Sequence, residues 1–221
     1  MAKRPVFVPN LKGFPFVQEV QIEFEWFPGF AKSQAQKSIA SQHRAAAQRG
    51  LSPILEISSK SVEALGSALS AFNLLLNLAE NQPMSVECAF QGSKVFENGG
   101  PYSDLYAMTS REAKTDERIR NSGKLITFRL LGEDFPTTPV MAFYDWLYLS
   151  ALWQNPPLAT QLSNYRAFSD IAFNPERSIN CQARSAALYV ALLHHAAIER
   201  ALSDKNYYLS LVAGKIPLKS R

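Results

Sequence analysis

The order of strand-like and helix-like segments constrains the fold of this chain most. Apolar and polar residues alternate over residues 5–9 and 17–25, which is the period of a half-buried strand. Later segments mostly show helical spacing, and strand character returns only over residues 54–58 and 125–128. A few strands among many helices predict a helix-rich α+β fold with a small sheet.

Sequence signals at helix ends give the helices approximate bounds. Gly50 closes the first helix, and Ser110 is expected to cap a later one. A pair of adjacent histidines, His194 and His195, is expected near the end of a helix. Besides the segment discussed below, helices are expected over residues 33–49, 62–70, 110–120, 143–155, 158–165 and 180–202.

Length and composition indicate one compact domain. The chain has 221 residues, of which 47% are hydrophobic and 19% charged, so it can bury a sizeable core. A change in pattern near residues 50–53 suggests an N-terminal extension of residues 1–50, packed on a domain of residues 51–221. The net charge of +4 suits a polyanionic substrate but is low for a dedicated nucleic-acid scaffold.

Several functional classes are excluded by what the sequence lacks. The two cysteines, Cys88 and Cys181, are too few for a disulfide framework, and the three histidines show no zinc-ligand spacing. No apolar run approaches the roughly 20 residues of a membrane span. We therefore expect a cytoplasmic protein that needs no metal or other cofactor and has no membrane partner.

Residues 85–96 carry the strongest candidate for chemistry. At about 100° per residue in a helix, Gln91 and Lys94 lie within roughly 40° of Glu87, so that a carboxylate, an amide and an amine share one face. Ser85 is expected as the N-cap. The alternative is a surface helix whose charged groups are solvated. The residues expected to anchor the helix in a core are Val86, Ala89, Phe90, Val95 and Phe96.

Four motifs in chain order resemble the NADAR family, which is named for its association with NAD and ADP-ribose metabolism. They are residues 69–73, residues 87–96 with the pattern Glu-x-x-Phe-Gln-x-x-Lys-x-Phe, residues 112–114 (Glu-Ala-Lys), and residues 154–158 (Gln-Asn-Pro-Pro-Leu). The resemblance covers roughly residues 54–185. It is greatest to the DarT-associated NADAR antitoxins, for which the similarity extends over residues 23–30. It implies a compact α+β domain with a cleft for an ADP-ribosyl group.

Members of this family are N-glycosidases. Some hydrolyse riboflavin-pathway intermediates, and the toxin-associated branch removes ADP-ribose from guanine bases. The resemblance makes Glu87 and Lys94 the candidate catalytic residues. A carboxylate such as Glu87 stabilises positive charge at the anomeric carbon or acts as general acid and base. Lys94 either attacks that carbon to form a Schiff base or binds a phosphate, and its spacing does not distinguish the two roles.

Further residues are candidates for binding ADP-ribose. For the aromatic candidates, the alternative role is packing in the core. For Asn73 it is the geometry of a turn, and for Arg111 and Lys114 it is a solvated helix face. The Trp and Gly of the family's Asp-x-x-Trp-Gly element are missing here. If the Asp of that element orients the sugar, then either Asn180 or Glu176 substitutes for it or the substrate differs. This departure favours the toxin-associated branch. The candidates are Ser70, Phe72, Asn73, Gln91, Arg111, Lys114, Tyr144, Trp146 and Asn180.

Three hypotheses about function follow. The first is an antitoxin enzyme that hydrolyses the link between ADP-ribose and guanine in single-stranded DNA, releases ADP-ribose and so reverses modification by a DarT-type toxin. The second is a module that binds ADP-ribose without cleaving it. A variant of the first, enzymatic hypothesis is a glycosidase that acts on a small ribosylated metabolite. The third is an antitoxin that sequesters the toxin through the N-terminal extension.

Overall fold

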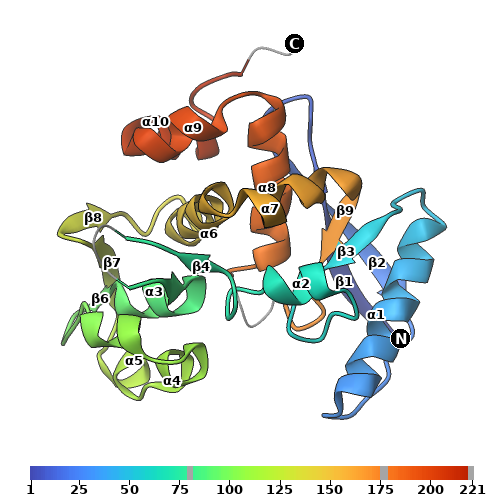
Figure 1. Ribbon diagram of the computed structural model, residues 1–221, viewed down its shortest axis with the longest axis horizontal. Coiled ribbons are helices and arrows are strands. Elements are labelled where there is room, and N and C mark those ends of the chain that lie inside the picture. The colour runs from blue at the N-terminus through green and yellow to red at the C-terminus, as the bar shows by residue number, and fades with distance from the viewer. Residues whose placement is uncertain (79–81, 175–178, 219–221) are drawn as a thin grey trace. The chain divides into compact units, whose positions relative to one another are not determined.

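The computed structural model describes residues 1–78, 82–174 and 179–218, and the chain forms two compact units (Figure 1). The first unit comprises Met1–Ser70 and Pro156–Arg221, and the second comprises Ala71–Asn155. Each combines helices with small sheets, so the expected helix-rich α+β fold is confirmed. The expected boundary between residues 50 and 51 stays a prediction.

The first unit contains a four-stranded sheet in the order β2-β1-β9-β3. β1 (Ala2–Pro9) and β2 (Val17–Phe24) pair antiparallel along their whole length, which confirms the two strands expected from the sequence. β9 (Ala167–Ser169) lies between β1 and β3 (Ile54–Glu56), antiparallel to the first and parallel to the second. β9 was not expected, because three residues are too few to show a period.

Two long helices cover this sheet. α1 (Lys32–Ala47) packs on β2, and α8 (Gln182–His194) packs on β1 and β9. One cluster of the buried core consists of Val6, Ile22, Ala46, Ile54 and Ala167. The other helices of this unit are α2 (Ala64–Ala68), α7 (Pro156–Ala159), the 3-10 helix η2 (Thr160–Asn164), α9 (Ile198–Ser203) and α10 (Lys205–Val212).

The single helix expected over residues 180–202 is wrong, because the chain breaks between α8 and α9. Ala196 has a φ of +52°, in the left-handed region. The amide of Ala197 donates to the carbonyl of Leu192 (2.9 Å), and that of Ala196 donates to Leu193 (3.0 Å). These two bonds form a Schellman motif, with alanine where glycine is usual. The expectation that the two histidines lie at a helix end is confirmed.

The second unit contains a three-stranded antiparallel sheet of β6 (Lys94–Phe96), β7 (Leu125–Leu130) and β8 (Glu133–Phe135). A second pair of strands consists of β4 (Leu75–Leu76) and β5 (Met84–Ser85). The rings of Phe128 and Phe143 stack with centroids 4.6 Å apart in the core. The helices are α3 (Val86–Gly92), the 3-10 helix η1 (Ser103–Ala107), α4 (Ser110–Thr115), α5 (Arg118–Asn121) and α6 (Ala142–Gln154).

The helix expected over residues 110–120 also needs correction. Its N-cap is Thr109 rather than Ser110, because Thr109 and Glu112 form a reciprocal capping box. The helix ends at Thr115, since Asp116 leaves the helical conformation with a ψ of 127°. The carboxylate of Asp116 then accepts hydrogen bonds from the backbone and side chain of Arg118, which opens α5.

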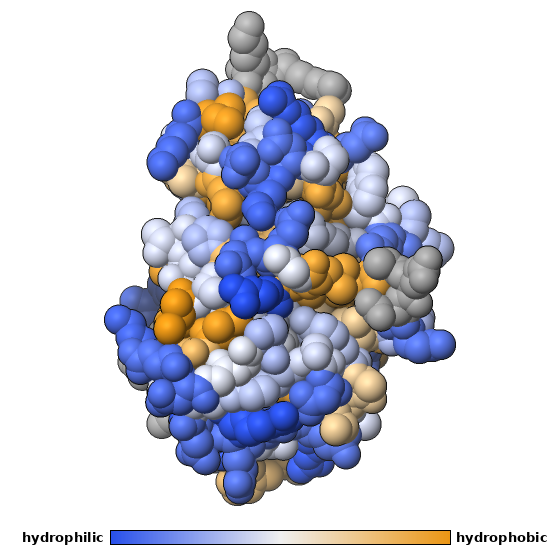
Figure 2. Space-filling model, turned by 90° about the vertical axis from the view of Figure 1, so that its left-hand side faces the viewer, coloured by the Kyte–Doolittle hydropathy of each residue, from blue (hydrophilic) through white to orange (hydrophobic). Residues whose placement is uncertain are grey.

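Hydrophilic and hydrophobic residues are interspersed on the face drawn in Figure 2, where the hydrophobic ones form small separate groups. In the described part of the chain, no helix is long and apolar enough to cross a membrane. The expected cytoplasmic location stays a prediction.

Candidate active site

The N-terminus of α3 is fixed by hydrogen bonds within the second unit. Ser85 is its N-cap, as expected, and accepts a hydrogen bond from the amide of Cys88 (3.1 Å). The amides of Val86 and Glu87 donate to the carbonyls of Leu74 and Ala71, each at 3.0 Å. The first amides of α3 are thus used within the protein, and the turn over residues 71–74 is attached directly to the helix that carries Glu87.

A chain of hydrogen bonds joins three candidate site residues. Gln91 Nε2 donates to Glu87 Oε1 (2.9 Å), and Lys94 Nζ donates to Gln91 Oε1 (2.7 Å). Glu87 and Gln91 are buried, and Lys94 is half-buried. Among the described residues, Gln91 is the only hydrogen-bond donor to the Glu87 carboxylate, so Oε2 is left for another donor or a ligand. The amide of Gln91 separates the carboxylate from the amine.

The expectation that Lys94, Val95 and Phe96 continue the helix is wrong. α3 ends at Gly92, where a Cβ atom would lie 2.5 Å from the Tyr106 ring. The chain then enters β6, in which Lys94 pairs with Phe128 of β7. Phe96 is buried as expected, but as part of a strand. The amine therefore meets Gln91 across a helix–strand junction rather than along one helix face.

The loop after β6 packs on the backbone of Lys94. Gly100 has a φ of +87°, and a Cβ atom there would lie 2.2 Å from the Lys94 carbonyl oxygen. Both the conformation and the close approach require glycine.

The environment of Lys94 makes its amine easier to deprotonate. Burial lowers the pKa of its amine to about 8, attraction by Glu87 raises it, and repulsion by Lys114 lowers it further. The amine also lies 4.6 Å from the centroid of the Phe90 ring, as in a cation–π contact. An amine with this pKa is partly neutral near neutral pH and can then act as a nucleophile.

Phe90 was not among the expected site residues, although it belongs to the family motif. The spacing of four residues between an aromatic side chain and a lysine is a signal that could have identified it. Its ring also contacts the edge of Tyr144, with centroids 5.2 Å apart. The Phe90 ring therefore contacts both the Lys94 amine and Tyr144 of the buried core.

The other candidate residues of the second unit differ in their burial and in their contacts. Lys114 Nζ lies 5.1 Å from the Phe72 ring centroid, and the ring is half-buried. Arg111, Asn73 and Lys114 are exposed. Tyr144 is buried in the core, which fits the packing alternative. Trp146 is half-buried and contacts the Phe135 ring at 5.1 Å, and a role for it in binding stays a prediction.

Two candidates do not belong to the second unit. Ser70 is buried and Asn180 is half-buried, and both lie in the first unit. Glu176, the alternative to Asn180, lies outside the described residues. A role for these three residues toward ADP-ribose stays a prediction.

The first unit has a buried polar cluster of its own. The Glu56 carboxylate accepts three hydrogen bonds, from Ser58 Oγ (2.7 Å), Ser169 Oγ (2.5 Å) and the amide of Ile171 (2.9 Å). Because Ser169 gives its one proton to Glu56, His43 Nε2 must donate to Ser169 Oγ (2.8 Å). Burial lowers the pKa of His43 to about 4, so that its imidazole is neutral.

Asp170 lies next to this cluster. Burial and then repulsion by Glu56 raise the pKa of Asp170 to about 7, and burial also raises that of Glu56. Since Glu56 and Ser169 are both almost inaccessible, a substrate cannot reach the centre of the cluster. We therefore do not consider it a second active site.

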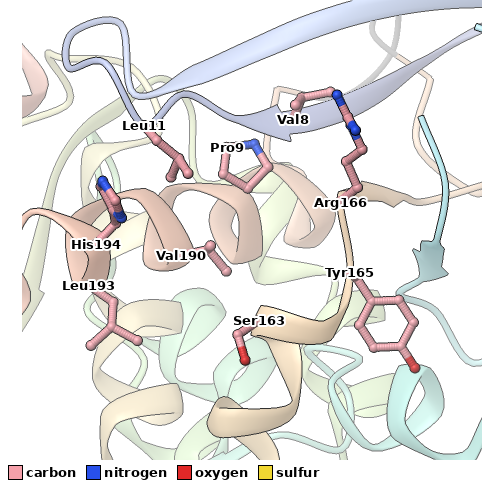
Figure 3. A pocket seen from close by; sticks show the side chains of 9 residues that line it. All are labelled: Val8, Pro9, Leu11, Ser163, Tyr165, Arg166, Val190, Leu193 and His194. Carbon is pink, nitrogen blue, oxygen red and sulfur yellow. The ribbon is translucent and has the colours of Figure 1, made fainter. Parts of the chain in front are cut away.

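The first unit also contains a cavity of about 540 Å³ with a mainly apolar wall (Figure 3). Its polar groups do not converge, since His194 and Arg166 lie at opposite ends of it (Figure 3). The hydroxyl of Tyr165 donates to Glu63 (2.6 Å). This arrangement lacks the convergent polar groups of a catalytic site.

Acidic and metal-binding side chains are dispersed in the described part of the chain. Within residues 1–78, 82–174 and 179–218, no three His, Cys, Asp or Glu side chains gather as metal ligands would. The two cysteines are buried and unpaired by disulfide. That the reaction needs no metal stays a prediction.

Comparison with known proteins identifies the family. The model of the family described as DarT1-associated NADAR antitoxin matches residues 2–220, nearly the whole chain. The chain therefore belongs to this family of antitoxins, and the resemblance seen in the sequence motifs is confirmed. No match was found among the curated proteins.

Proposed function

We propose that this antitoxin is a hydrolase that cleaves the N-glycosidic bond between ADP-ribose and guanine in DNA. It would thereby reverse modification by a DarT-type ADP-ribosyltransferase, its functional partner. The proposal rests mainly on a pair of side chains: the buried Glu87 carboxylate, whose Oε2 has no donor among the described residues, and the Lys94 amine, whose pKa is lowered. Membership of the antitoxin family supports it.

Each residue has a defined task in the proposed reaction. As the bond to guanine breaks, positive charge develops at the anomeric carbon, and the Glu87 carboxylate stabilises it. Neutral Lys94 forms a bond from Nζ to that carbon, and guanine leaves with a proton taken from the amine. The sugar ring then opens to a Schiff base, its ring oxygen gaining a proton. Water adds to the imine and releases ADP-ribose and free Lys94.

Lys114 and Arg111 are proposed to bind the pyrophosphate, and the half-buried Phe72 ring to pack on the ligand. Both cations are exposed, so their attraction to phosphate is expected to weaken with salt. Asn73 and Gln91 would add hydrogen bonds to the ribose, the latter through the second N–H of its amide.

A trapping experiment tests the proposal. Borohydride added during turnover of guanine-modified single-stranded DNA should reduce the Schiff base and attach the sugar to Lys94, which mass spectrometry can locate. Turnover should rise with pH through about 8, because the amine must lose its proton. If Lys94 only binds phosphate, activity should instead fall above that pH. Binding of ADP-ribose without any turnover would support a non-catalytic module.

A further inference from the structure

Two serine hydroxyls link three elements that carry candidate site residues. Ser110 Oγ, at the start of α4, lies 2.8 Å from the carbonyl oxygen of Phe72 and 2.7 Å from Ser85 Oγ. Ser85 Oγ in turn accepts a hydrogen bond from the amide of Cys88 (3.1 Å). All four residues belong to the second unit.

The hydroxyl of Ser110 is the donor in both contacts, to the carbonyl oxygen of Phe72 and to Ser85 Oγ. A hydroxyl has one proton, so Ser110 shares it between these two acceptors. Ser85 Oγ accepts from both Ser110 and the amide of Cys88. A single hydroxyl therefore connects the Phe72 turn to the N-cap of α3.

These hydrogen bonds connect positions close to the proposed catalytic and binding groups. Ser85 lies two residues before Glu87, and Ser110 lies one helical turn before Lys114. Phe72 contributes the carbonyl at one end, and its ring faces the Lys114 amine. Movement at Ser110 would therefore change the position of the Phe72 turn and of Lys114 relative to Glu87.

We propose that Ser110 is a positioning residue of the active site, which sets the Phe72 turn and α4 against the N-terminus of α3. This inference rests on the proposed function of Glu87 and Lys94. Ser110 does not itself react with the substrate. Because the N-cap of α4 is Thr109, replacing Ser110 leaves the helix cap intact, so the variant removes the link alone.

The test compares three variants of the full chain. Ser110→Ala breaks the link, and Ser110→Thr keeps a hydroxyl at the same position. Ser150→Ala is the matched control, because Ser150 is a buried serine whose hydroxyl, as far as the described residues show, donates only to the Trp146 carbonyl within α6 (2.8 Å). Two measurements are made on each: kcat and KM with modified DNA, and hydrogen–deuterium exchange of the amides of residues 86–88.

Ser110→Ala should lower kcat by about tenfold to a hundredfold, with a smaller change in KM, because the reacting groups are misplaced. The amides of residues 86–88 should exchange faster. Ser110→Thr should restore both values, and Ser150→Ala should change neither. If Ser110→Ala matches Ser150→Ala in kcat and exchange, the inference is overturned.

The exchange measurement keeps this inference separate from the proposed function. If the parent chain shows no turnover, the proposed function is wrong. The hydrogen–deuterium exchange of residues 86–88 then tests the hydrogen bonds of Ser110 by itself. Faster exchange in Ser110→Ala but not in Ser110→Thr would then still support the link. Equal exchange in all variants would overturn it.

Discussion

The two units each bury a glutamate, and the two carboxylates differ in what surrounds them. Glu56 accepts three hydrogen bonds and has a second carboxyl group, Asp170, as its neighbour. Glu87 accepts one hydrogen bond among the described residues and is connected through Gln91 to an amine. The first carboxylate uses its hydrogen-bonding capacity within the protein, whereas the second keeps part of it unused.

We infer from this difference that Glu56 has a structural role, and we propose a catalytic one for Glu87. The three donors to the buried Glu56 carboxylate fix the segments that supply them. Glu56 belongs to β3, and its hydrogen bonds hold Ser169 of β9 and the amide of Ile171 in place. A carboxylate oxygen that has no donor in the described part of the chain is available to a ligand. Such an arrangement is expected where a ligand supplies the missing interaction.

The largest effect is expected from Lys94→Ala, which removes the proposed nucleophile. Turnover should fall by at least about 10³-fold, and the borohydride adduct should disappear. Binding of ADP-ribose should change less than about tenfold, roughly 1.4 kcal/mol, measured by calorimetry. Lys124→Ala is the control, since Lys124 is an exposed lysine of the same unit. Parental turnover in Lys94→Ala would show that the amine is not needed.

The comparison of the two glutamates can be tested directly with Glu87→Gln and Glu56→Gln. Glu87→Gln should lower kcat by about 10²- to 10³-fold, because an amide cannot neutralise the charge of the transition state. Loss of the Glu87 charge should also lower the pKa of Lys94 further. Glu56→Gln should instead lower the melting temperature and leave kcat unchanged. The opposite pattern would reverse the assignment of the two roles.

Gln91→Glu gives the site a second carboxylate and tests how a charge next to Lys94 affects turnover. The new charge would lie at the 2.7 Å contact with Lys94 Nζ and should raise the pKa of that amine. The pH profile of turnover should then shift upward, with about tenfold less activity at pH 7 for each pKa unit. Gln91→Met is the uncharged comparison. An unshifted profile in Gln91→Glu would contradict the proposed nucleophile.

The smallest effect is expected from Asp170→Asn and concerns stability alone. Because the folded pKa of Asp170 is about 7, the folded state holds a proton that the unfolded state releases between about pH 4 and pH 7. The stabilisation from this group is therefore lost as the pH rises through 7. The melting temperature of Asp170→Asn relative to the parent should be higher at pH 8 than at pH 5. A pH-independent difference would show that Asp170 is not protonated in the folded state.

Local signals predicted much of the second unit correctly. Ser85 caps α3 as expected, and Glu87, Gln91 and Lys94 lie together as their spacing indicated. The strand containing Lys94 could not be predicted in this way, because it depends on pairing with β7, about 30 residues later. Long-range pairing overrode the helical spacing, yet Lys94 still reached Gln91 from the strand.

Other features escaped prediction because they depend on single contacts. Thr109 rather than Ser110 caps α4, which releases the hydroxyl of Ser110 for its bonds to Phe72 and Ser85. In the first unit, the three residues of β9 are too few to show a period. Ala196 adopts a left-handed conformation for which its sequence gives no sign. These are tertiary effects that one sequence does not encode locally.

Because the junction between Gly92 and Lys94 is short, the contact between Gln91 and Lys94 is sensitive to inserted residues. One residue added within a long helix rotates the following side chains by about 100°. One residue that shifts the register of a strand instead moves every following side chain to the opposite face of the sheet. An insertion that shifted β6 by one residue would turn the Lys94 amine away from Gln91, so we expect it to impair the proposed reaction as much as loss of the lysine.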